Sequence, residues 1–378
     1  MMHTSRLRLA SALVVSVLAL AACSGDDGAT VRDLGSEDSS ASGSTSRSSS
    51  ASASAPSGSD VGSDEEDGGY AYASNVSAHR MLVADLCPLG DLLDAGEFEA
   101  VAALYRDGGS SVNSDGSVRT IAGFATSEDR LHGLADYYSA ATPLDDFVSA
   151  ALDGTGMFES ESQAVRAQAV EKGIRNQAMI AWLVHELESA LDKARSGDFD
   201  VAEGAVHNWD EAWAFYHGAE PGCAPYATAN SRAGNFGTVA DDGATALANI
   251  DILDAMIAGR DALVAQDLAG AEAAAAEVRR GVFITYSQAA VRYASVIEAD
   301  LAADDIAAAE EHQAEGLAFW RVIEAYAAQA GADVATVNAI FDLANPPGAN
   351  GFGDDVRAAL APAWQQLGIT EADIGTLQ

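Results

Sequence analysis

The chain has 378 residues, of which 57 are Asp or Glu and only 20 are Lys or Arg, giving a formal net charge of −37 at pH 7. Binding to nucleic acid needs a basic surface that neutralises phosphates, whereas lysine occurs here only at Lys172 and Lys193. The composition therefore excludes nucleic acid as a partner. Such an acidic surface attracts cations, but it is equally typical of a highly soluble or salt-adapted protein.

Residues 1–22 have the pattern of a signal peptide. Two arginines precede a short apolar run, which ends in Leu20-Ala21-Ala22 before Cys23. A basic region, an apolar region and small residues before the cut are typical of a secretory signal, and the terminal Cys indicates a bacterial lipoprotein. The run is shorter than the roughly 20 apolar residues of a membrane-spanning helix. We expect lipid on Cys23 to be the only membrane attachment, holding the protein on the outer surface of a bacterial membrane.

A tether and a folded region follow the signal. Residues 23–69 are almost entirely Ser, Gly, Ala and acidic residues, a composition that cannot bury a core and predicts a disordered spacer. We expect a smaller, mostly helical module over residues 70–160 and a larger helical region over residues 161–378, which together form one compact unit.

The folded region is predicted to be all-α. Its long Ala, Leu and Val stretches are interrupted by Gly and Asp, and alternating β-branched runs are almost absent. Start and stop signals place helices over about 164–194, 200–217, 244–257, 263–299, 304–330 and 355–367. A loop is predicted between the second and third of these, around Asn230 and Gly237, because Asn and Gly are common in turns.

An internal repeat organises the larger region. The hexamer EAWAFY at 211–216 returns as EGLAFW at 315–320, and the preceding helices align so that His185 matches Tyr293. The sequence therefore predicts a helical bundle built from two related helical hairpins. Chance similarity between Ala-rich helices is the alternative.

Two cysteines remain after Cys23. Cys87 and Cys223 each lie beside a proline in a loop context, and an exported protein meets an oxidising environment. We predict a structural disulfide between them. Two free thiols or a role in metal binding are the alternatives, although no C-x-x-C spacing is present.

Carboxylates and imidazoles at helical spacing indicate a metal site. His207 with Glu211, and Glu311 with Glu315, are i,i+4 pairs that share one helix face. Glu211 and Glu315 also belong to the aromatic hexamers, where a buried carboxylate is costly unless it is paired. If the hairpins pack as equivalents, these four side chains converge in the bundle core. The N/O ligand set suits iron, with manganese and zinc as alternatives.

The preceding helices offer further ligands. We expect His185 and Glu188 to add an imidazole and a carboxylate, and Tyr293 to supply a phenolate. The alternative for each residue is an ordinary solvated position in a very acidic chain. His79 and His132, in the smaller module, are expected to be structural.

Three segments carry a family resemblance. The pattern H-x-W-D-E-x-W-A-F-Y-H-G stands at 207–218, C-A-P-Y-x-T-A-N-x-R-A-x-N-F-G-T at 223–238 and E-G-x-A-F-W-R at 315–321. Together they resemble the algal iron-assimilation periplasmic proteins and their bacterial lipoprotein relatives, from about Ser74 to Ala330. The resemblance implies extracytoplasmic iron binding in support of uptake, without hydrolytic activity. It does not assign the ligands.

These observations predict a lipid-anchored, extracytoplasmic iron-binding protein that is not an enzyme. It would bind ferrous or ferric iron and pass the metal to a membrane transporter or permease. Signatures of α/β-hydrolases, phosphate loops and dinucleotide sites are absent from the sequence. A helical surface metalloenzyme resembling an iron oxidase, and a metal-free structural or adhesive lipoprotein, are the two alternatives.

Overall fold

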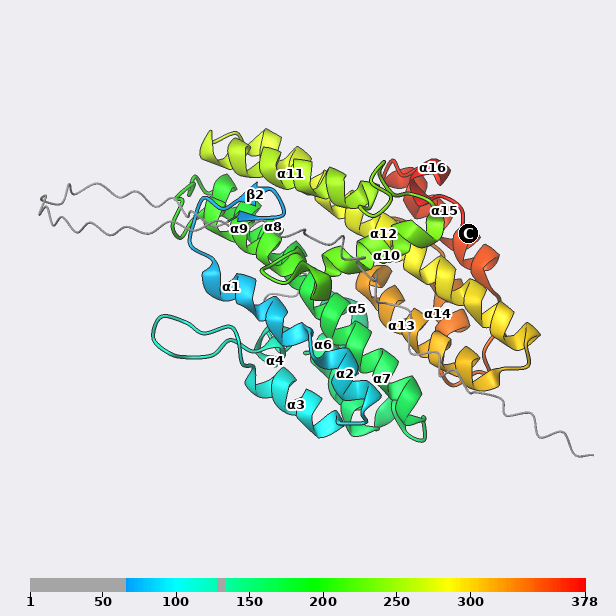
Figure 1. Ribbon diagram of the computed structural model, residues 1–378. Helices are drawn as coiled ribbons and strands as arrows, with labels where there is room; N and C mark the ends of the chain where they lie inside the picture. Colours follow the sequence, from blue (N-terminus) through cyan, green and yellow to red (C-terminus); the bar gives the residue numbers. More distant parts are fainter. Residues whose placement is uncertain (1–65, 128–132) are drawn as a thin grey trace, which may run out of the picture. The chain divides into compact units, whose positions relative to one another are not determined.

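Helices form nearly all of the regular structure in the computed structural model, which describes residues 66–127 and 133–378 (Figure 1). The all-α prediction is confirmed. The predicted signal, Cys23 and nearly all of the predicted tether lie outside the described residues, as does His132, so the expectations about them stay predictions. The described residues all belong to one unit, which extends to Gln378. Within them, no helix is long and apolar enough to cross a membrane.

The N-terminal module consists of a strand pair and short helices. Strands β1 (Glu66–Asp67) and β2 (Tyr70–Ala71) are antiparallel, with Asp67 opposite Tyr70. The segments that follow are α1 (Ser77–Leu82), η1 (Val83–Leu86), α2 (Leu89–Asp94), α3 (Phe98–Asp107), α4 (Ile121–Ala125), α5 (Leu134–Tyr138), α6 (Pro143–Asp153) and η3 (Gly156–Phe158).

The first hairpin follows this module. It comprises α7 (Gln163–Lys172), a π-helical turn η4 (Gly173–Ala178), α8 (Met179–Arg195) and α9 (Ala205–Tyr216). The first three segments form the single helical pattern predicted from the sequence, with the π turn inside it. α8 packs along α9, and α1 and α11 also contact α9.

The second hairpin is built from the longest helices. α11 (Leu247–Val264) and α13 (Ile306–Gln329) both pack along α12 (Leu268–Ala302) (Figure 1). Asp267 and Asp305 cap the starts of α12 and α13 by accepting hydrogen bonds from backbone N–H groups of the first turn. The chain closes with α14 (Val334–Phe341), α15 (Gly353–Gln366) and α16 (Glu371–Ile374).

The predicted loop around Asn230 and Gly237 is wrong, because most of it forms helix α10 (Pro225–Phe236). Pro225 occupies the first turn, where its missing N–H costs nothing. Gly237 ends the helix in the left-handed conformation with φ 68°. The Asn230 side chain does not break the helix, because its Oδ1 accepts hydrogen bonds from the Ala246 backbone and from the amide of Asn249.

The disulfide predicted between Cys87 and Cys223 is confirmed, with an S–S distance of 2.08 Å. Cys87 directly follows η1, and Cys223 ends the short helix η5 (Pro221–Cys223) before α10. The bridge therefore ties the N-terminal module to the segment that follows the first hairpin.

Helix α9 is held in a fixed orientation by Trp209. The indole Nε1 donates a hydrogen bond to the Met256 carbonyl on α11 over 2.8 Å. Gly259 lets the two helices approach, because a Cβ at that position would lie 1.9 Å from Trp209 Cζ2. With Trp209 directed at α11, helix geometry turns the next two residues, Asp210 and Glu211, toward other neighbours.

Candidate metal centre

Two histidines contact the Glu211 carboxylate. His79 Nδ1, from α1, lies 3.0 Å from Glu211 Oε1, and His207 Nε2, one turn earlier on α9, lies 3.2 Å from the same oxygen. Glu211 is 7% exposed, and a carboxylate so deeply buried has to be paired. We call His79, His207 and Glu211 the Glu211 cluster.

The electrostatics of this cluster keep Glu211 ionised. Burial acts to raise the pKa of Glu211, but hydrogen bonds from His207 and His79 outweigh burial and hold the pKa well below its usual range. Glu211 is therefore a carboxylate at neutral pH, and its oxygens act only as acceptors.

Helix α8 adds a second carboxylate and imidazole beside the cluster. The Asn208 amide donates a hydrogen bond to Glu186, and its nitrogen lies 3.4 Å from Glu211 Oε2. His185 Nε2 lies 3.9 Å from Glu186 Oε1 and 3.2 Å from Ser189 Oγ. The Asn208 amide thus connects Glu186 to Glu211.

Asp210 ties the other side of α9 to the segment after β2. Its Oδ1 accepts a 2.6 Å hydrogen bond from Tyr70, and its Oδ2 accepts from the Ala73 and Ser74 backbone N–H groups at 3.0 and 2.7 Å. The Ser74 hydroxyl donates to the same Oδ2 over 2.8 Å. Burial raises the pKa of Asp210 above its usual value, although these hydrogen bonds oppose the shift.

Glu315 occupies the equivalent position in the second hairpin and has different partners. Tyr293 donates a 2.5 Å hydrogen bond to Glu315 Oε1, and the Lys172 ammonium lies 3.5 Å from the same oxygen. Lys172 also pairs with Glu171 at 2.8 Å, and Arg232 Nη1 donates to the Tyr293 hydroxyl over 2.9 Å. We call Lys172, Tyr293 and Glu315 the Glu315 cluster.

The structure brings together the predicted pair His207 and Glu211, and it places Tyr293, which was predicted as a further ligand, against Glu315. The predicted meeting of both hairpins in one site is replaced by the two clusters, because α9 packs on α1, α8 and α11 while α13 packs on α7 and α12. Each glutamate therefore takes its partners from its own surroundings.

The remaining predicted ligands have other surroundings. Glu188 forms an ion pair with Arg279 of α12, although its i,i+3 spacing from His185 predicted a shared face. Glu311 is half-buried, and burial raises its pKa above the usual value. The neighbouring His312 Nδ1 lies 2.6 Å from Asp300 Oδ2 on α12.

Sequence reasoning missed His79, Glu186 and Ser74 as members or neighbours of the candidate site. His79 was assigned a structural role because it lies in the N-terminal module, and no spacing rule connects it to Glu211. For Glu186 a signal existed, since it directly follows His185, but the periodicity of α8 did not show which of its acidic residues faces α9.

The Glu211 cluster contains residue types that bind metal ions, but these residues are not arranged as a complete metal site. Among residues 66–127 and 133–378, no group of three or more His, Cys, Asp or Glu side chains is arranged to hold a metal ion as it stands. Two ligand atoms about 2.1 Å from one ion and at right angles are about 3.0 Å apart. The two His–Glu separations of 3.0 and 3.2 Å are close to that value, which is also an ordinary hydrogen-bond distance.

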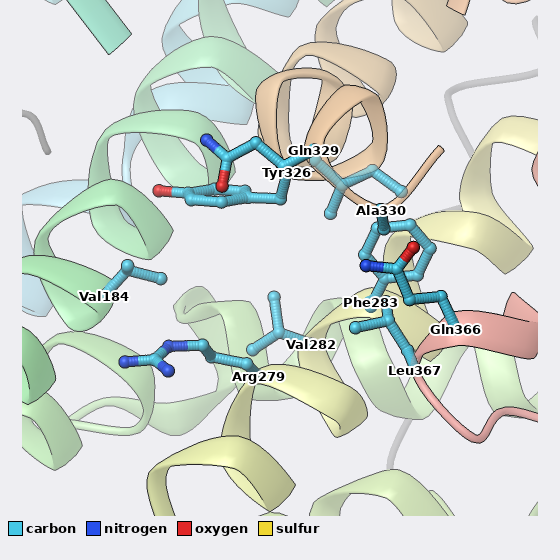
Figure 2. Close-up of a pocket in the computed structure, with 10 residues that line it drawn as sticks. Val184, Arg279, Val282, Phe283, Tyr326, Gln329, Ala330, Gln366 and Leu367 are labelled. Carbon is cyan, nitrogen blue, oxygen red and sulfur yellow. The ribbon is translucent and has the colours of Figure 1, made fainter. Parts of the chain in front are cut away.

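A separate cavity of about 350 Å³ lies between α8, α12, α13 and the end of α15. Figure 2 shows Arg279 and Tyr326 at one end, and Phe283, Gln366 and Leu367 at the other. Mostly apolar walls with a few polar groups are typical of small-molecule pockets. The residues that line it do not include those of the Glu211 or Glu315 clusters, so the cavity is a different feature from the candidate metal centre.

Comparison with known proteins gives one match. A family model described as "low iron-inducible periplasmic protein" matches residues 50–378, which include every residue of both clusters. No curated protein and no solved structure matches the chain.

Proposed function

Since the chain belongs to the family of low iron-inducible periplasmic proteins, we propose that it binds iron outside the cytoplasm and supports uptake of the metal. The resemblance found in the sequence is confirmed by this membership. The family description connects the chain with iron supply and with the periplasm. Iron binding itself is our proposal, and the Glu211 cluster is the site we propose for it.

The observation that carries the proposal is that two imidazoles and one carboxylate meet inside the fold. Imidazole nitrogen and carboxylate oxygen suit first-row cations such as iron. The Glu211 charge persists at neutral pH, and the cation needs to displace only protons or hydrogen bonds from the two rings. An exposed acidic patch would bind weakly, because salt screens exposed charges within about 10 Å at 0.1 M.

The anchor and tether extend the proposal beyond the described residues. Lipid on Cys23 and a spacer over residues 23–69 would keep the iron site near the membrane while leaving it free to reach a membrane transporter or permease. Capture at the Glu211 cluster followed by transfer to such a partner is therefore the role we propose, with no chemical conversion of substrate.

The experiment compares Glu211→Gln with Glu315→Gln, which removes the same charge from the equivalent position of the other hairpin. Mature protein is titrated with ferrous iron without oxygen, and bound metal is measured by mass spectrometry after buffer exchange. We expect high-affinity binding in the wild type and in Glu315→Gln, and loss of binding in Glu211→Gln. Equal metal content in the wild type and Glu211→Gln would overturn the proposed site.

A further inference from the structure

The Ser74 hydroxyl lies between Asp210 and His207. Its Oγ is 2.8 Å from Asp210 Oδ2, to which it donates, and 3.0 Å from His207 Nδ1. Ser74 is completely buried, so water does not compete for these contacts. The two hydrogen bonds therefore have to be satisfied together.

Counting hydrogens decides the direction of the second bond. A serine hydroxyl has one hydrogen to donate, and Asp210 accepts it. The same Asp210 Oδ2 also accepts from the Ser74 and Ala73 backbone N–H groups, as an ionised oxygen does. Only a lone pair of Ser74 Oγ is left to face His207. His207 Nδ1 must therefore carry a hydrogen and donate it to Ser74.

The proton on Nδ1 determines what the other nitrogen offers. A neutral imidazole has one N–H group, so with that hydrogen on Nδ1 the lone pair lies on Nε2, which is 3.2 Å from Glu211 Oε1. A ring that carries a second proton donates it from Nε2 to Glu211. Once that proton leaves, the lone pair and the carboxylate oxygen repel each other unless a metal cation takes its place. Metal-binding histidines commonly have their other nitrogen fixed by such an outer hydrogen bond.

We propose that Ser74 is a positioning residue, which holds the proton of His207 on Nδ1 and so keeps Nε2 available to a cation at Glu211. This inference rests on the proposed function of the Glu211 cluster. Without the Ser74 oxygen, Glu211 Oε1 attracts the proton to Nε2. The ring and the carboxylate then satisfy each other and compete with the metal.

The segment that carries Ser74 is itself firmly held. Asp67 in β1 accepts two hydrogen bonds from Arg80 at 2.6 and 2.7 Å and one from the Tyr72 hydroxyl at 2.7 Å. Its carbonyl accepts from the Trp213 indole on α9 over 3.0 Å. The β1–β2 segment is thus fastened to α1 and α9, and Ser74 cannot easily move away from His207.

The test compares the wild type with Ser74→Ala. The control is Ser117→Ala, because Ser117 lies in an exposed loop. In metal-free protein labelled with ¹⁵N at histidine, two-bond ¹H–¹⁵N correlations at pH 8.5 (~2 units above the ordinary imidazole value) report which ring nitrogen carries the hydrogen. We expect Nδ1–H for His207 in the wild type and Nε2–H in Ser74→Ala. The affinity for ferrous iron should fall about 10- to 100-fold in Ser74→Ala and recover in Ser74→Thr, which restores a hydroxyl.

The two readouts separate the inference from the function on which it rests. Nε2–H in wild-type His207 would overturn the role of Ser74. So would a Ser74→Ala variant whose hydrogen position and iron affinity equal those of the wild type. Iron binding by the wild type still stands in either case. If no variant binds iron but the hydrogen follows Ser74, the proposed function fails and the assignment of the proton is supported. Far-ultraviolet circular dichroism checks that each variant is folded.

Discussion

Glu211 and Glu315 are the first residues of two similar sequence hexamers, and their charges are compensated by different groups. Both are nearly buried, at 7% and 6% exposure. Glu211 is contacted by two imidazoles, whereas Glu315 is contacted by an ammonium group and a phenol. An ordinary imidazole loses its proton near pH 6.5 and an ordinary ammonium only near pH 10.4. In the proposed function a metal ion replaces the hydrogens that the imidazoles direct at Glu211, whereas the cation beside Glu315 is the Lys172 ammonium of the chain itself.

The comparison gives a reason why only one of the two similar hexamers carries the proposed metal site. A buried carboxylate has to be compensated at both positions, and at Glu315 the ammonium of Lys172, from α7 of the first hairpin, contributes to this without any added ligand. Four predictions test this difference, in order of decreasing expected effect.

Removing the built-in cation should damage stability without affecting metal binding. Lys172→Met leaves the buried Glu315 without its ammonium partner, and breaking such a buried pair costs about 3–5 kcal/mol. Lys193→Met is the matched control, because Lys193 is only partly buried and its ammonium donates to the Glu203 carbonyl rather than to a buried carboxylate, so its loss should cost about 1.5 kcal/mol or less. Urea unfolding measures both variants, and similar losses of stability would show that Lys172 does not have the role assigned to it.

Adding ferrous iron should stabilise the wild type but not Glu211→Gln. A ligand that binds only the folded state adds about 2.7 kcal/mol at a concentration one hundred times its Kd. Differential scanning calorimetry with and without metal measures the effect as a rise in Tm. Glu315→Gln, compared with its own Tm without metal, should show the full rise. A rise that persists in Glu211→Gln and disappears in Glu315→Gln would place the metal at Glu315 instead.

Acidification from pH 7 to pH 5 should release the metal from a folded protein. Protons compete with metal for imidazole nitrogen, and an ordinary imidazole is mostly protonated at pH 5, so affinity should fall more than tenfold. The pKa of Glu211 is lowered by folding, so its contribution to stability is present above the unfolded value of about 4.3 and is lost only in stronger acid. Affinity that stays constant down to pH 5 would exclude both histidines as ligands.

Replacing one histidine should weaken binding by about tenfold, which corresponds to about 1.4 kcal/mol. His79→Ala removes one of the two imidazoles at Glu211. His312→Ala is its control, because it removes a half-buried histidine paired with Asp300 near the second hairpin's cluster. Isothermal titration with ferrous iron compares the two variants, and equal affinities would show that His79 is not a ligand.

Local patterns predicted the parts of the molecule that depend on neighbours along the chain. The all-α class, most helix ranges and the proximity of His207 to Glu211 follow from the 3.6-residue period, which places residues four apart on one face. The same reasoning fails for α10, because Asn and Gly are common in turns and so favour a loop around Asn230 and Gly237. In the structure the Asn230 side chain accepts a hydrogen bond from the Ala246 backbone, and Gly237 only ends the helix.

The sequence by itself determined the long helices, which two cysteines are available to pair and which carboxylates lie in apolar surroundings. Tertiary structure decided what compensates those carboxylates. Packing of α1 on α9 brings His79 to Glu211, and packing of α7 on α13 brings Lys172 to Glu315. A sequence period records only the face on which a residue lies. The residue opposite that face depends on which helices pack together, and that is settled by the burial of the whole core.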